Sequence, residues 1–142
     1  MGLEDARRKL EEPPEARSMK VGVILSSDDP IDLYVAGTYV ATEVARGNEV
    51  VVFVTGRAVL AFAGRATEPD SPEAAKMREL RVTWRELFES AKALGARVIA
   101  CETAARIFGV GEEEFKTAGL VERVTSMYTF LEEVADGRLI AF

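Results

Sequence analysis

The chain has 142 residues, of which 48% are hydrophobic and 30% charged, and its 18 basic and 24 acidic residues give a net charge of −6. This length favours one domain with its own core, and an acidic chain without a basic cluster is a poor candidate for direct nucleic-acid binding. No apolar run approaches the roughly 20 residues that span a bilayer, and no signal peptide is visible, so we expect a cytoplasmic protein without a membrane span.

The residue inventory narrows the possible chemistry. The chain contains no histidine and a single cysteine, Cys101. Ser-His-Asp and Cys-His catalysis, histidine-ligated zinc and an intramolecular disulfide are therefore excluded. Motifs for dinucleotide binding, P-loop NTP hydrolysis and esterase chemistry do not occur either. We expect no metal site and no cofactor.

From residue 20 onward, strand-like and helix-like segments alternate along the chain. Residues 1–18 are charge-rich and broken by two prolines, which predicts a short mobile arm before a single α/β domain at residues 19–142. Short apolar runs rich in β-branched residues predict five strands, at 20–26, 48–56, 97–101, 120–124 and 138–142.

Helix-capping residues mark the segments between the strands. Asp29 suits an N-cap, Pro30 a first helical position and Gly47 a C-terminal stop. The longest predicted helix spans residues 72–94 and ends at Gly95. Its apolar residues recur every three or four positions, as one buried stripe of a helix would: Met77, Leu80, Trp84, Leu87, Ala91 and Leu94. The last helix is predicted to begin after Ser126 and to stop at Gly137.

Five strands separated by helices, without a hairpin signal, predict a three-layer α/β/α sandwich around a five-stranded, mostly parallel sheet. Sites in such sheets form beyond the carboxyl ends of the strands. The candidate positions are therefore the loops that follow Ser26 and Thr55, and the strand end at Cys101.

The first of these loops, residues 26–32, has no glycine and carries adjacent carboxylates, which argues against a phosphate cradle. A phospho-acceptor receiver domain is also rejected, because Cys101 stands where the acceptor aspartate would be. We interpret Asp29 and Asp32 as capping residues worth about 1 kcal/mol. The remaining loop residues are predicted to line a pocket: Ser26, Ser27 and Asp28.

Two other clusters have ordinary structural interpretations. The three consecutive acids within residues 111–115 point in different directions around a helix and cannot converge on one metal ion. Core packing is the default for the large aromatic side chains, although a ligand pocket or a subunit interface is an alternative: Trp84, Phe88, Tyr128 and Phe130.

Cys101 admits two interpretations. Unpaired cysteines often behave as small buried hydrophobic residues. Against this, Cys101 stands where a parallel strand ends and a helix begins, and the backbone N–H groups of residues 103–106 would favour a thiolate there. Glu102 and Thr103 are polar and make solvent access plausible. Glu102 opposes a thiolate, and Arg106 could offset it.

Five motifs occur in one order along residues 20–142: VGVILSSDDP, VARGNEVVVF, VTGRAVLAF, LGARVIACETAARIFGV and LEEVADGRLIAF. Together they resemble the DsrE/DsrF-like family, sulfur-trafficking proteins that include tRNA-thiolation relay subunits. The segment around Cys101, which continues through Thr and Ala and closes on Gly, is the most specific. The arm at 1–18 and the helix around 71–94 depart from the family pattern.

The resemblance implies a parallel α/β sandwich that assembles into oligomers, with Cys101 carrying sulfur as a persulfide. Our first hypothesis is thus a persulfide carrier that receives sulfur from a donor protein and yields it to an acceptor. Its pocket would be lined by Ser26, Ser27, Asp28, Thr55, Gly56 and Thr103. The alternative is a non-catalytic oligomeric subunit that binds a small ligand or a protein partner, in which the cysteine is structural or redox-sensing.

Overall fold

The computed structural model describes residues 18–65 and 70–142. Strands and helices alternate in these residues as predicted. In chain order they are β1 (Lys20–Leu25), α3 (Pro30–Ala45), β2 (Glu49–Val54), α4 (Ala58–Phe62), α5 (Pro72–Leu80), α6 (Trp84–Ala93), β3 (Arg97–Cys101), α7 (Glu102–Phe108), α8 (Glu112–Ala118), β4 (Arg123–Thr125), α9 (Met127–Val134) and β5 (Arg138–Ala141). The predicted arm lies outside the described residues except for Ser18, so the division into arm and domain stays a prediction.

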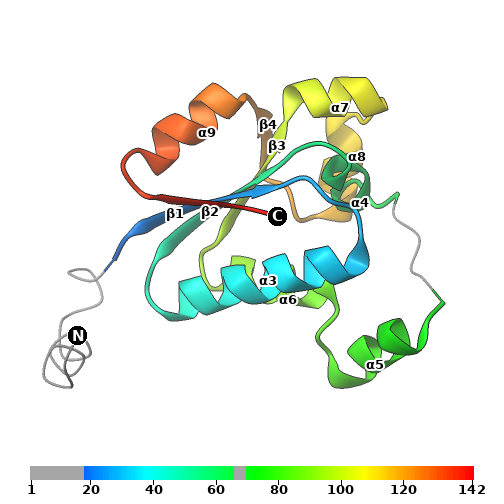
Figure 1. Cartoon of the computed structure of the whole chain (residues 1–142). Coiled ribbons are helices and arrows are strands. Elements are labelled where there is room, and N and C mark those ends of the chain that lie inside the picture. The colour runs from blue at the N-terminus through cyan, green and yellow to red at the C-terminus, as the bar shows by residue number, and fades with distance from the viewer. Residues whose placement is uncertain (1–17, 66–69) are drawn as a thin grey trace, which may run out of the picture.

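The five strands form one sheet in the order β4-β3-β2-β1-β5, and every neighbouring pair is parallel. Helices α3 and α6 cover one face and α9 covers the other (Figure 1). The larger apolar core lies on the α3 side, whereas α9 buries Phe130 and Val134 against Val51, Phe53 and Ile99. The predicted three-layer sandwich is confirmed.

Helix α3 begins as its capping residues predict. The Asp29 carboxylate accepts the N–H groups of Ile31 at 2.8 Å and Asp32 at 3.3 Å, and Pro30 is the first helical residue. Gly47 follows the helix with φ at 90°, the left-handed stop expected there. A capping carboxylate accepts a backbone N–H group at the start of the helix. The Asp32 Oδ2 instead accepts the Ser27 hydroxyl at 2.7 Å.

The prediction of one long helix at 72–94 is wrong. The chain breaks at Arg81, whose φ is 58°, and α6 starts afresh with Thr83 as N-cap. The Thr83-x-x-Glu86 pattern, typical of a helix start, could have revealed this. The break ends the predicted stripe: Trp84 and Ala91 are buried, but 59% of Leu80 and 66% of Leu94 is exposed. Helix α5 projects away from the sheet (Figure 1).

Two further expectations need correction. Strand β4 starts at Arg123 instead of residue 120, and Leu120 and Val121 pack into the core from the preceding loop. Of the four aromatic residues assigned to the core by default, Tyr128 is 74% exposed while the other three are buried.

In the turn after α9, the residue with a positive φ is Ala135. The sequence had predicted that Gly137 would stop this helix. Ala135 has φ 52° and ψ −120°, and the Gly137 N–H donates to the Val134 carbonyl at 3.0 Å. This resembles a type II′ turn, whose first central position strongly prefers glycine.

Ala135→Gly should therefore raise the free energy of unfolding by about 1 kcal/mol, because the strain of a β-carbon at positive φ outweighs the entropy lost with glycine. Urea denaturation measures this change. Ala45→Gly, at an exposed helical position of ordinary φ, should instead lower the stability. Equal effects of the two substitutions would contradict the assignment of strain to Ala135.

Candidate functional site

Cys101 is both the last residue of β3 and the N-cap of α7, so the strand passes into the helix without a loop. Its backbone is extended, with φ −74° and ψ 121°, and its Sγ accepts the Ala104 N–H at 3.4 Å. The side chain is half-buried and touches the cores on both faces of the sheet. The half-buried Cys101 thus lies at the carboxyl edge of the sheet, and within the described residues its sulfur has one backbone donor.

The loops after β1 and β2 reach the same edge because all strands are parallel. Gly56, with φ at 51°, lies so close to Ser26 that an added β-carbon would stand 3.1 Å from the Ser26 carbonyl oxygen. Ser26 donates its N–H, at 2.9 Å, and its hydroxyl, at 3.1 Å, to the carbonyl oxygen of Phe142. The Thr55 N–H donates to the Leu25 carbonyl at 2.9 Å. The predicted pocket residues of both loops therefore pack against each other.

The predicted residues of α7 are placed differently. Glu102, Thr103 and Arg106 are exposed, and within the described part of the chain their side chains make no hydrogen bond or ion pair. Arg106 therefore does not pair with Glu102. Among the same residues, the only hydrogen bond to the Cys101 sulfur comes from Ala104. The site has a backbone donor and no side-chain ligand on the sulfur.

Two arginines at this edge escaped the sequence analysis. Arg57 donates through Nε to the Asp28 carboxylate at 3.1 Å, and its guanidinium lies 5.8 Å from the Phe108 ring centroid. It thereby joins the loops after β1 and β2 to the end of α7. Its position directly after the Thr55-Gly56 strand end was the available signal.

Arg65 fixes the far end of α7. Its guanidinium binds both carboxylate oxygens of Glu114 at 2.8 Å and donates to the carbonyls of Phe108 and Gly109. The Arg65 hydrogen bonds, with the Gly111 N–H, hold the pKa of Glu114 below its usual value. This clamp ties α8 to the C-terminus of the helix that starts at Cys101.

A comparison of the sequence with protein families identifies the family of the chain. The sequence profile of the DsrE/DsrF-like family matches residues 19–142. The chain belongs to the DsrE/DsrF-like family.

Two solved structures share the fold of this DsrE/DsrF-like chain. The conserved protein of unknown function BT1422 from Bacteroides thetaiotaomicron is 16% identical, with a TM-score of 0.60 over 87% of this chain and 94% of that one. The protein of unknown function MTH1491 from Methanobacterium thermoautotrophicum is 17% identical, with a TM-score of 0.56 over 87% and 99%. No curated protein matches the chain significantly.

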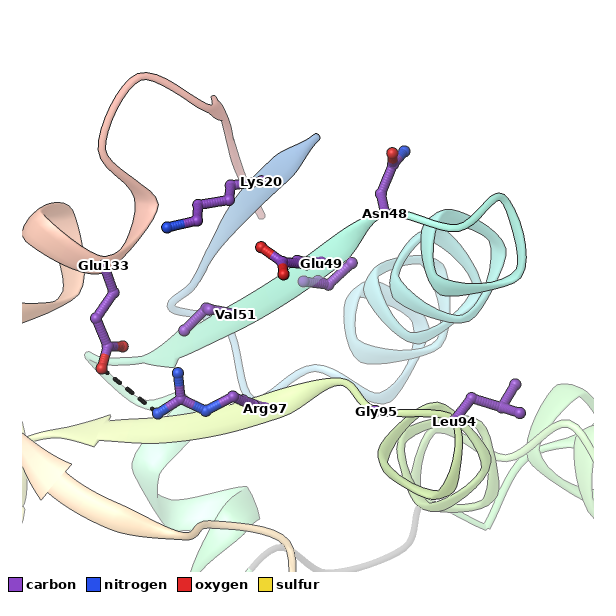
Figure 2. A pocket seen from close by; sticks show the side chains of 9 residues that line it. Lys20, Asn48, Glu49, Val51, Leu94, Gly95, Arg97 and Glu133 are labelled. Carbon is purple, nitrogen blue, oxygen red and sulfur yellow. Dashed lines mark hydrogen bonds and ion pairs between the residues drawn. The ribbon is translucent and has the colours of Figure 1, made fainter. Parts of the chain in front are cut away.

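Across residues 18–65 and 70–142, no group of carboxylates and sulfur could hold a metal ion, and no helix could cross a bilayer. A hollow lies at the amino ends of β1, β2 and β3 (Figure 2). Cys101 is at the other end of β3.

Proposed function

We propose that the protein carries sulfur as a persulfide on Cys101. The observation that carries this proposal is a half-buried cysteine at a strand-to-helix junction, with a backbone N–H directed at its sulfur. Membership of the DsrE/DsrF-like family supports it. A cytoplasmic location, as expected from the sequence, suits a chemistry that depends on reduced thiols.

The transfer needs no metal and no second cysteine in the chain. The Cys101 thiolate attacks the outer sulfur of a donor persulfide, R–S–SH, forms a new S–S bond and releases R–S⁻. An acceptor thiolate then attacks the outer sulfur of the Cys101 persulfide and regenerates the Cys101 thiolate, so no net oxidation occurs. The Ala104 N–H, 3.4 Å from the Cys101 Sγ, stays in contact with the sulfur in both steps.

In this proposal the neighbouring residues shape the approach to the sulfur. The loops after β1 and β2 form one wall, through Ser26, Ser27, Asp28, Thr55 and Gly56. The exposed side of α7 forms the other, through Glu102 and Thr103 in its first turn and Arg106 in its last. Arg57 links the two walls through Asp28 and Phe108.

Mass spectrometry after incubation with a persulfide donor tests the proposal. The wild type should gain about 32 Da, one sulfur atom, which a reducing thiol removes, and Cys101→Ser should gain none. Ser126→Ala, which alters the cap of α9 and not the thiol, should load like the wild type. Equal uptake by wild type and Cys101→Ser would refute the carrier and favour the non-catalytic subunit, with a structural or redox-sensing cysteine.

We also propose that the protein assembles with copies of itself. Large apolar side chains are exposed on α7, α9 and β5, and Ile107 and Tyr128 are more than 70% exposed. Light scattering at micromolar concentration should give a mass above that of the monomer, and Tyr128→Lys should lower it. A strictly monomeric wild type would contradict this.

A further inference from the structure

The hollow at the amino ends of the strands has a volume of about 550 Å³, within the usual range of small-molecule sites. The sheet register brings its lining together, since Lys20 pairs with Glu49 and Val51 with Arg97. Glu133 of α9 and Leu94, just after α6, border it (Figure 2). Four elements of the fold thus contribute to one concave surface.

Two of its charged groups have no partner. Within the described residues, neither the Lys20 ammonium nor the Glu49 carboxylate makes an ion pair or a hydrogen bond. Both side chains are exposed, and they stand on neighbouring strands. Each is therefore available to a group of opposite charge on a ligand.

Glu133 adds a buried acceptor. Its Oε1 accepts from Arg97 at 3.4 Å and also from Arg123, and in Figure 2 its carboxylate faces the Arg97 guanidinium. Its Oε2 is buried and accepts no hydrogen bond from the described residues. Glu133 is thus held by two arginines and its Oε2 is closed to a ligand, so the free charges of the hollow are those of Lys20 and Glu49.

We propose that this hollow binds a small zwitterion, an α-amino acid with an apolar side chain. The ligand ammonium donates to the Glu49 carboxylate, the ligand carboxylate accepts from Lys20, and the side chain lies against Val51. The net charge of the lining is zero, because two basic residues balance two acidic ones: Lys20, Arg97, Glu49 and Glu133. A simple anion would face the unpaired Glu49 carboxylate, and a simple cation the unpaired Lys20 ammonium. This site is separate from Cys101 and does not depend on sulfur transfer.

Nuclear magnetic resonance titration of the ¹⁵N-labelled full chain with L-leucine, L-methionine and L-phenylalanine tests the proposal. At least one should give saturable shifts at the amides of Lys20, Glu49 and Arg97, with a Kd of about 1 mM. For leucine, L-leucinamide and isocaproate, which each lack one charge, should bind about tenfold more weakly.

Variants on the hollow provide the second arm of the test. Lys20→Met and Glu49→Gln should each weaken binding about fivefold, because each loses one charge pair with the ligand. Lys76→Met on α5 and Glu132→Gln on α9, both exposed and absent from the hollow's lining, should bind like the wild type. The proposal is overturned if none of the three amino acids gives saturable shifts. Analogues or hollow variants that bind as tightly as the reference would also overturn it.

Discussion

Replacing Gly137 by alanine should lower the free energy of unfolding by about 3 kcal/mol. A β-carbon at this position would overlap the carbonyl oxygen of Lys20 and would stand 2.8 Å from its carbonyl carbon. Backbone atoms of a central strand cannot move aside as the end of a flexible side chain can. The substitution would therefore push β5 away from β1.

The displacement would also reach the cysteine edge. Beyond β5, Phe142 accepts two hydrogen bonds from Ser26, and its ring lies 5.7 Å from that of Tyr39. Urea denaturation measures the loss of stability. Gly111→Ala is the matched control, because nothing lies within 4 Å of its added β-carbon, and it should cost less than about 1 kcal/mol. Similar losses in both variants would show that the close approach at Gly137 does not matter.

Replacing Glu43 by glutamine should lower the free energy of unfolding by about 2 kcal/mol, and by alanine about 3 kcal/mol. Glu43 is only 2% exposed, and both of its carboxylate oxygens accept hydrogen bonds. Oε1 accepts from Arg46 at 2.7 Å, and Oε2 from Asn48 at 2.9 Å and Arg138 at 2.5 Å. The carboxylate thus joins α3 to the residue before β2 and to the first residue of β5.

The loss should be smaller than for a fully buried ion pair, because Arg46 and Arg138 are partly exposed and can regain water. Glu132→Gln, at an exposed position without a partner in the described chain, should change stability by less than about 0.5 kcal/mol. A double-mutant cycle with Arg138→Gln isolates the contact between α3 and β5. Additive losses in that cycle would mean that this ion pair contributes nothing.

The prediction from sequence succeeded where the signal is local. The caps at Asp29 and Ser126 and the short apolar strands other than β4 formed as expected, because they depend on neighbouring residues. The break at Arg81 was missed because a continuous apolar periodicity concealed the second N-cap at Thr83. Glu43 continues the buried stripe of α3, three residues after Val40, but a charged residue type does not predict burial.

By itself, the sequence determined the alternation of strands and helices, the class of the fold and the place of Cys101 at a strand end before a helix. These follow from hydrophobic periodicity and capping chemistry, which act over a few residues. The tertiary structure alone decided the strand order, the half-buried state of the sulfur and the partners of Glu43. It also decided the charged hollow at the opposite edge. Each of these depends on residues far apart in the chain, which meet only when the sheet and helices pack.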